Sequence, residues 1–179
     1  VADRRVDHVA FTGSVEGGHA VVRAASERFI SFGLELGGKD PAYVRADADI
    51  GFAAENVVEG ALFNSGQSCC GVEQIYVHDA VWDDFIEAAV AAVSGWRLGL
   101  PDDPETMLGP VARAHSAREI QAQIDAAIAA GARPLIDPTP FRPAMKLGPT
   151  FLPPQLLIDV DHSMDIMAEE TFGPVAGIM

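Results

Sequence analysis

Short apolar runs alternate along the chain with longer amphipathic stretches. Runs rich in β-branched and aromatic residues predict strands at 6–11, 32–36, 42–44, 74–77, 156–160 and 175–179. Stretches with apolar residues three or four positions apart predict helices at 17–29, from Asp47 or Asp49 to 64, at 79–96 and at 114–130. Strands that alternate with helices favour an α/β fold with a largely parallel sheet.

Two of these helices have an apolar stripe that we expect to face the core. In the helix at 79–96, which Asp79 is expected to cap, the stripe includes two tryptophans that we interpret as core residues rather than as a ligand platform. The segments 98–110 and 137–149 are rich in Gly, Pro and Asp and are predicted as loops. The stripes consist of Ala20, Val21, Ala24, Ala25 and Phe29 in the first helix, and of Trp82, Phe85, Ala89, Val93 and Trp96 in the second.

The composition excludes several functional classes. The chain has 179 residues, 49% of them hydrophobic, which suits one folded domain or one domain with part of another. Twelve Lys+Arg against 26 Asp+Glu give a net charge of −14, which disfavours binding to nucleic acid. No apolar run reaches the roughly 18 residues of a membrane span, and no signal-peptide core is present, so we expect no membrane partner and a cytoplasmic location.

The only two cysteines, Cys69 and Cys70, are adjacent in the stretch FNSGQSCCG. Adjacent cysteines form a disulfide only with strain, and the five histidines are scattered, so we expect neither a disulfide framework nor a metal site. A thiolate is a strong nucleophile, and small neighbours leave it open to a substrate and to backbone N–H donors. The alternative is a buried free cysteine with no chemical role.

Two further stretches carry candidate chemistry. FTGSVEGG at 11–18 places a glycine-rich turn between a strand and a helix, as dinucleotide-binding turns do, although its spacing is not G-x-G-x-x-G. LELGGK at 34–39 places Glu35 between two leucines of a strand. The carboxylate either points away from the core or is buried with a raised pKa, as a general base requires.

These stretches together resemble the aldehyde dehydrogenase superfamily. The matching motifs are Phe-Thr-Gly-Ser followed by Gly18, Glu-Leu-Gly-Gly-Lys at 35–39, Gly-Gln-x-Cys at 66–69 and Glu-Glu-Thr-Phe-Gly-Pro at 169–174. Asp47-Ala48-Asp49 and Leu108-Gly109-Pro110 also fall where family members carry similar residues. The resemblance covers essentially the whole chain, whereas the chain covers less than half of a typical member.

The resemblance implies an oxidoreductase that oxidises a small-molecule aldehyde to a carboxylic acid with NAD or NADP, through a cysteine thiohemiacetal and a thioester. It implies that Cys69 is the nucleophile and Glu35 the general base. Residues 1–35 would be the C-terminal strip of the dinucleotide-binding domain and residues 36–179 a catalytic domain truncated at its C-terminal end. The parent enzyme would be a homodimer or homotetramer. The implied cofactor-binding residues are Gly13, Ser14, Gly18, Leu36, Glu170 and Phe172.

The chain departs from the family pattern in ways that leave alternatives open. The upstream half of the cofactor domain, with its ribose-binding lysine and oxyanion-hole asparagine, is absent. Position 74, usually Arg in the family, is Gln74. A truncated, non-enzymatic scaffold or partner-binding fragment is therefore one alternative. A thiol-dependent esterase is another, because acylation and deacylation require only Cys69 and Glu35.

Overall fold

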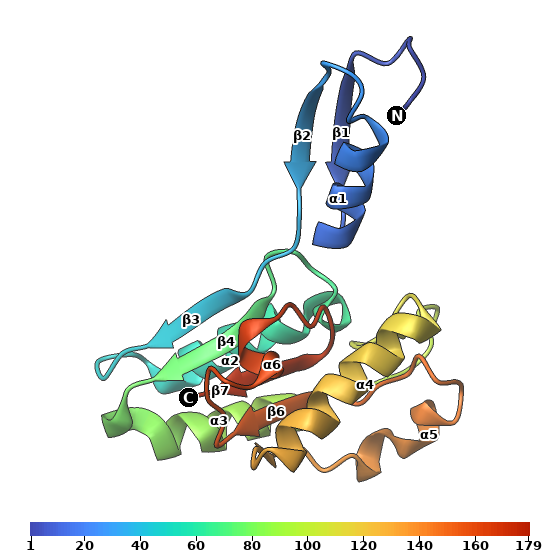
Figure 1. The fold of residues 1–179 in the computed structure, drawn as a ribbon. Helices are drawn as coiled ribbons and strands as arrows, with labels where there is room; N and C mark the ends of the chain where they lie inside the picture. The colour runs from blue at the N-terminus through green and yellow to red at the C-terminus, as the bar shows by residue number, and fades with distance from the viewer. The chain divides into compact units, whose positions relative to one another are not determined.

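The computed structural model describes residues 1–179, which form two units, Val1–Gly38 and Lys39–Met179 (Figure 1). The division falls between the last glycine and the lysine of the Glu-Leu-Gly-Gly-Lys motif, close to the boundary expected after residue 35. Glu35 and Leu36 therefore belong to the first unit, whereas the cysteines belong to the second.

The first unit is a strand–helix–strand element. Strands β1 (His8–Thr12) and β2 (Ser31–Glu35) are parallel and are connected by helix α1 (Val15–Ala24). Ser14 caps α1, since its hydroxyl accepts a hydrogen bond from the Gly17 N–H at 3.1 Å. The Arg28 guanidinium donates to four carbonyl oxygens of the N-terminal segment, those of Val1, Asp3, Arg4 and Val6.

Helix α1 is shorter than its sequence predicted. It ends at Ala24 because the following amides bond three residues back, Ala25 N–H to the Val22 carbonyl and the next amide to the Arg23 carbonyl. The predicted stripe was wrong at three positions: Ala20 and Ala24 are exposed, and Phe29 lies beyond the helix with its side chain in solvent. The residues that the unit buries here are Gly18 and Ala25.

The second unit contains a five-stranded sheet of order β3-β4-β7-β6-β5. All neighbouring strands are parallel except β5 and β6, which are antiparallel. The prediction of an α/β fold with a largely parallel sheet is thus confirmed. The strands are β3 (Asp40–Val44), β4 (Val72–Val77), β5 (Arg133–Pro134), β6 (Gln155–Ile158) and β7 (Val175–Ile178).

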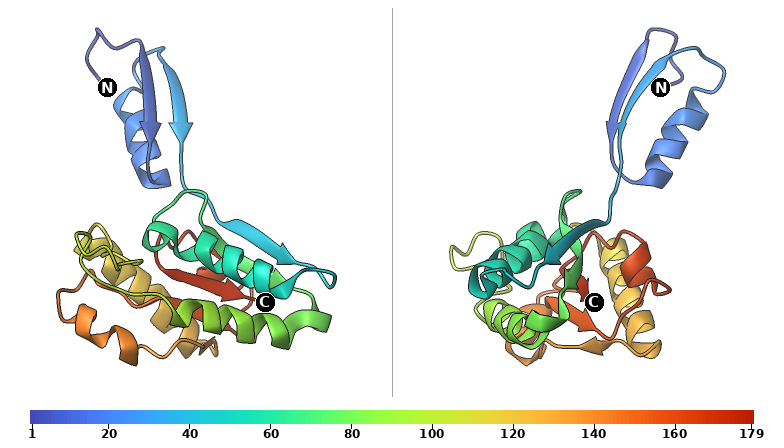
Figure 2. Two further views of the ribbon diagram at one scale, coloured as in Figure 1. Left: turned by 180° about the vertical axis from the view of Figure 1, so that it is seen from behind. Right: turned by 90° about the vertical axis from the view of Figure 1, so that its left-hand side faces the viewer.

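Helices cover both faces of this sheet (Figure 2). Helices α2 (Ile50–Leu62) and α3 (Trp82–Ser94) pack over one face, and α4 (Ala114–Ala129) and α6 (Asp165–Ala168) over the other. The strands divide their side chains accordingly: Leu156 and Ile158 enter the core under α2 and α3, while Leu157 enters the core under α4. The remaining helical turns are η1 (Phe63–Gly66), η2 (Asp79–Val81), η3 (Thr139–Phe141) and α5 (Arg142–Met145).

The starts of α2 and α3 differ in how they are capped. Asp49 caps α2 as expected, since its carboxylate accepts from the Phe52 N–H. Asp79 does not cap α3; it begins η2, which the His78 side chain caps instead. Trp82 and Trp96 pack partly buried against the core, as predicted.

The two predicted loops differ in outcome. Segment 98–110 is irregular apart from an isolated bridge between Leu98 and Leu108, as expected. Segment 137–149 was predicted to lack regular structure, but it forms η3 and α5, whose prolines stand in the first helical turn where they are tolerated.

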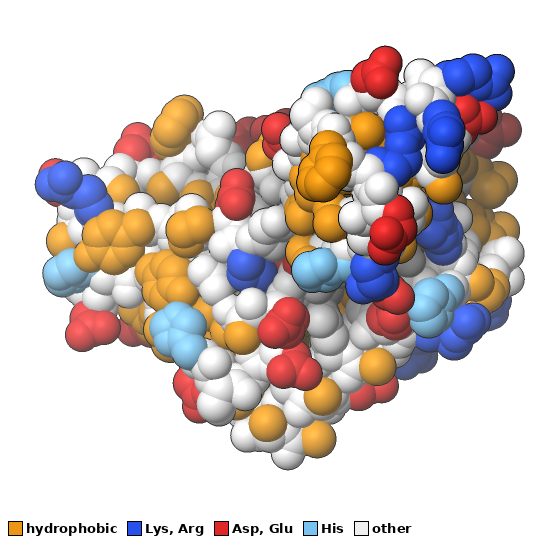
Figure 3. Space-filling view, turned by 45° about the horizontal axis from the view of Figure 1, so that its top comes forward, with side chains coloured by type: hydrophobic (Ala, Val, Ile, Leu, Met, Phe, Trp, Pro, Cys, Tyr) orange, Lys and Arg blue, Asp and Glu red, His pale blue; other side chains and the backbone are white.

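The surface mixes side-chain types. Figure 3 shows carboxylates, basic groups and apolar side chains intermixed on the face turned to the viewer. None of the helices combines the length and hydropathy that crossing a bilayer requires. No group of three or more His, Cys, Asp or Glu side chains is arranged to hold a metal ion.

Candidate functional site

The cysteine loop, Phe63–Gly71, follows directly after α2. Helix α2 ends at Leu62 because Asn64, Ser65 and Gly66 adopt left-handed backbone angles, with φ of 51°, 59° and 69°. A turn then closes with a 3.0 Å hydrogen bond from the Gly71 N–H to the Ser68 carbonyl. This turn carries both cysteines, and both are exposed.

The two thiols differ in their surroundings. Cys70 Sγ lies 3.3 Å from the Ser68 hydroxyl, whereas Cys69 Sγ has no hydrogen-bond partner in the described chain. The expectation that the cysteines are open to an approaching molecule is therefore confirmed, and the burial expected under the alternative is wrong; the chemical role of Cys69 stays a prediction.

Polar side chains hold the loop in this shape. Gln67 Oε1 accepts from the Ala112 N–H at 2.8 Å, and Gln67 Nε2 donates to the Asn64 carbonyl at 3.1 Å. The Ser65 hydroxyl, itself buried, donates to the Gly109 carbonyl at 2.8 Å. In the sequence, the Gly-Gln motif and Leu108-Gly109-Pro110 were two separate signals. The structure shows that hydrogen bonds join the loop of the Gly-Gln motif to the segment that contains Leu108-Gly109-Pro110.

The loop also packs against the segment before β7. A Cβ at Gly66 would lie 1.9 Å from the Gly173 carbonyl oxygen, so only glycine permits this approach. Residues 169–174, the Glu-Glu-Thr-Phe-Gly-Pro motif, therefore lie beside the cysteine loop in the second unit. In this motif Phe172 is partly exposed and has a left-handed φ of 51°, and the Glu170 carbonyl accepts from Gln123 Nε2 at 3.5 Å.

The first unit brings together its own candidate residues. The Gly13 N–H donates to the Glu35 carbonyl at 3.0 Å, which joins the glycine turn to the end of β2. Leu36 covers Gly18, where a Cβ would lie 2.8 Å from the leucine side chain. The Glu35 side chain is exposed. Of the two orientations that the sequence allowed, it therefore points away from the core and is not buried.

The same unit offers features that fit a phosphate group of a dinucleotide. The turn lies at the carboxyl ends of two parallel strands, where the N-terminus of α1 presents its first amides and the positive end of its dipole. Gly13 and Gly17 also have a packing role, since a Cβ at either would lie 2.7 Å from the Phe11 ring. The absence of a side chain at these two positions thus lets the turn and the start of α1 pack closely against Phe11.

Comparisons with known proteins identify the family to which the chain belongs. The family model described as "Aldehyde dehydrogenase family" matches residues 1–179. The chain belongs to this family. Among characterised relatives, it is 37% identical to a succinate-semialdehyde dehydrogenase [NADP(+)] of Mycobacterium leprae over 98% of its own length and 38% of the relative's. It is 39% identical to a vanillin dehydrogenase of Pseudomonas fluorescens over 100% of its length and 36% of the relative's.

Solved structures of the aldehyde dehydrogenase family show the same fold. A crystal structure of betaine aldehyde dehydrogenase from Staphylococcus aureus in complex with NAD+ matches with a TM-score of 0.90 and 33% identity, over 99% of this chain and 35% of that one. Lactaldehyde dehydrogenase from Escherichia coli matches with a TM-score of 0.87 and 32% identity, over 98% of this chain and 36% of that one. The chain thus spans little more than a third of the length of these proteins.

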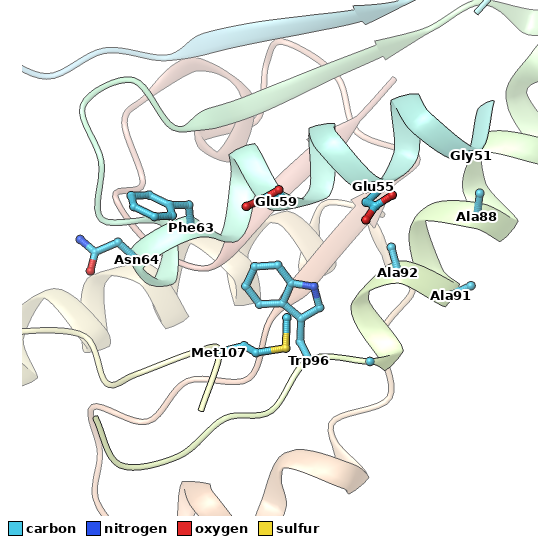
Figure 4. A pocket seen from close by; sticks show the side chains of 11 residues that line it. Gly51, Glu55, Glu59, Phe63, Asn64, Ala88, Ala91, Ala92, Trp96 and Met107 are labelled. Carbon is cyan, nitrogen blue, oxygen red and sulfur yellow. The ribbon is translucent and has the colours of Figure 1, made fainter. Parts of the chain in front are cut away.

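The larger unit also has a groove on its surface. This groove of about 790 Å³ runs between α2 and α3. Figure 4 shows Phe63 and Asn64 toward one end of it, Gly51 and Ala88 toward the other, and Trp96 and Met107 between them. Two carboxylates of α2, Glu55 and Glu59, also line it. Phe63 and Asn64 belong to the cysteine loop, so the groove borders the start of that loop on the α2 side.

Proposed function

We propose that the protein containing this chain is an NAD(P)-dependent aldehyde dehydrogenase that oxidises an aldehyde to a carboxylic acid. The observation that carries the proposal is the exposed, unpartnered Cys69 thiol on a turn fixed by left-handed backbone and by Gln67. Family membership over residues 1–179 supports it. Characterised and solved relatives include an NADP(+) enzyme and complexes with NAD+, so either dinucleotide is a candidate.

The nucleophilic step uses Cys69. Its thiolate attacks the aldehyde carbon and forms a tetrahedral thiohemiacetal, whose oxyanion requires hydrogen-bond donors. The bound nicotinamide supplies the hydride acceptor. Loss of hydride from the former aldehyde carbon leaves a thioester on Cys69. The exposure of the thiol on the Ser68–Gly71 turn supports this role, because a substrate carbon can reach it from solvent.

The hydrolytic step uses Glu35 as a general base. Its carboxylate takes a proton from water, the water oxygen attacks the thioester carbon, and the carboxylic acid leaves as the Cys69 thiolate is regenerated. The Glu-Leu-Gly-Gly-Lys match at 35–39 supports this role, although the carboxylate is exposed at the end of β2 and not buried between the two leucines.

The remaining motif residues are proposed to hold the dinucleotide. In the first unit, Gly13, Ser14 and Gly18 form the turn and first helical turn suited to a phosphate, and Leu36 lies against Gly18. In the second unit, Glu170 is proposed to hold the nicotinamide ribose and Phe172 to pack beside the ring. The partial exposure and left-handed backbone of Phe172 support a role in binding.

We also propose that the protein is cytoplasmic and that it forms a homodimer or homotetramer. Light scattering of the full-length protein would test the oligomeric state.

The experiment is aldehyde-dependent reduction of NAD or NADP by the full-length protein. We expect Cys69→Ser to abolish it and the matched Cys70→Ser to retain it. Mapping of a haloacetamide adduct should find Cys69 labelled, and labelling confined to Cys70 would overturn the assignment. A protein without reductase activity that hydrolyses an activated ester would instead be a thiol esterase, and one with neither activity would be a scaffold.

A further inference from the structure

A buried carboxylate that the proposed chemistry does not use lies at the start of β4. Glu73 is only 4% exposed, and it alternates in β4 with Ile75 and Val77, which belong to the apolar core. It coincides with an irregularity in strand pairing: Asp40 of β3 pairs with Val72, whereas the next residue, Pro41, pairs with Gln74. Glu73 is thus the extra residue of a β-bulge, a feature that redirects a side chain.

One lysine and two backbone N–H groups compensate the charge of the Glu73 carboxylate. Oε2 accepts from Lys39 Nζ at 2.6 Å and from the Thr171 N–H at 2.8 Å, and Oε1 accepts from the Phe172 N–H at 2.9 Å. Lys39 Nζ also donates to the Thr171 hydroxyl at 3.1 Å. A buried carboxylate is tolerated only when it is paired and hydrogen-bonded, and here both of its oxygens are.

These bonds fix an unfavourable backbone. Phe172 is a non-glycine residue with φ of 51°, a conformation that persists only where its surroundings enforce it. Two successive N–H groups, those of Thr171 and Phe172, point at one carboxylate, which is the arrangement that enforces it. The next residue, Gly173, is the one whose carbonyl touches Gly66 of the cysteine loop.

We propose that Glu73 is a positioning residue for the nicotinamide half of the dinucleotide, acting through the backbone of Thr171 and Phe172. This inference rests on the proposed function for the roles of Glu170 and Phe172. The carboxylate holds residues 170–172 in one conformation before the cofactor arrives, so binding does not have to order them. The ligand class is the nicotinamide ribose, and the contribution of Glu73 to its binding is indirect.

The test compares Glu73→Gln with a matched control in the full-length protein. The control, Glu119→Gln, removes a carboxylate of α4 whose side chain is 63% exposed. It is therefore far more solvated than Glu73. Two quantities are measured: hydrogen–deuterium exchange of the peptide that spans 169–174 without cofactor, and KM for NAD or NADP and for the aldehyde. For Glu73→Gln we expect faster exchange and a cofactor KM raised about 10-fold, the effect of losing one charge-assisted hydrogen bond. The aldehyde KM and both quantities in Glu119→Gln should be unchanged.

A double variant separates positioning from charge balance. Lys39→Met combined with Glu73→Gln removes both buried charges, so stability should recover relative to either single variant. Exchange and cofactor KM should stay altered, because the carboxylate acceptors are still missing. The double variant also serves if the single variant does not fold.

Two outcomes would overturn the inference: unchanged exchange at 169–174 in Glu73→Gln, or recovery of normal exchange and cofactor KM in the double variant. Either would make Glu73 only the counterion of Lys39. If the wild-type protein reduced no dinucleotide, the proposed function would fail by itself, and the exchange data would still decide whether Glu73 fixes the segment.

Discussion

Replacing Gly66 with alanine would test the contact on which the geometry of the cysteine loop depends. The new Cβ would lie 1.9 Å from the Gly173 carbonyl oxygen and 2.3 Å from its carbonyl carbon, so one of the two backbones must move. A left-handed φ of 69° costs alanine about 1 kcal/mol relative to glycine. Overpacking in a close contact adds about 1–3 kcal/mol. The expected loss is therefore about 2–4 kcal/mol of the free energy of unfolding.

Urea unfolding followed by tryptophan fluorescence is the suitable assay. Both tryptophans, Trp82 and Trp96, lie in the second unit, so their signal reports the unit that contains Gly66. Gly131→Ala is the matched control: its φ is 115°, but no atom lies within 4 Å of the added Cβ. Gly131→Ala therefore has the backbone strain of a positive φ but no steric clash. It should lower the free energy of unfolding by about 1 kcal/mol.

The difference between the two variants measures the collision. With a urea m-value of about 1–3 kcal/mol per M, the expected difference moves the midpoint by roughly 1 M. Cys69 alkylation should also change rate in Gly66→Ala and not in Gly131→Ala, because only the first displaces the cysteine loop. Equal losses of stability in the two variants would refute the packing of Gly66 on Gly173.

Three further predictions concern the site. Glu35→Gln in the full-length protein should leave a burst of reduced cofactor close to one per active site while turnover falls roughly 10²–10⁴-fold; loss of the burst in rapid-mixing experiments would place Glu35 earlier in the reaction. Gln67→Ala should cost about 0.5–1.5 kcal/mol in urea unfolding, because the exposed Ala112 N–H exchanges its acceptor for water, and an unchanged midpoint would contradict the role given to Gln67. The 179-residue chain alone should bind NAD or NADP weakly in calorimetry, since of the nucleotide-binding half it carries only the turn at 11–18; tight stoichiometric binding would argue against the motif assignment.

Local sequence signals predicted the parts of the fold that local interactions determine. Asp47 and Asp49 were the two candidate caps for α2, and the structure selects Asp49, whose carboxylate accepts from the N–H three residues ahead. The alternation of strands with helices predicted the parallel sheet. The small residues around Cys69 favoured an exposed thiol over a buried one, and the thiol is exposed.

Distant contacts account for what sequence reasoning missed. Glu73 reads as an ordinary polar residue in a strand, and its burial becomes intelligible only with Thr171, a partner 98 positions away. The short elements β5 and α6 have too few residues to show a periodicity. The end of α1 was placed too late because Phe29 continued the apolar spacing, although it lies past the turn that ends the helix.

The order of strands in the larger sheet has a consequence for how the site forms during synthesis. Strand β7 lies between β4 and β6, and the residues just before it complete the surroundings of the cysteine loop. Chains emerge from the ribosome N-terminus first, so Cys69 is made about a hundred residues before Gly173 can support its loop. A nascent chain that ends before residue 170 carries the thiol without its fixed geometry. The cysteine loop thus acquires its supported conformation only after β7 has been made and has inserted between β4 and β6, two strands made earlier.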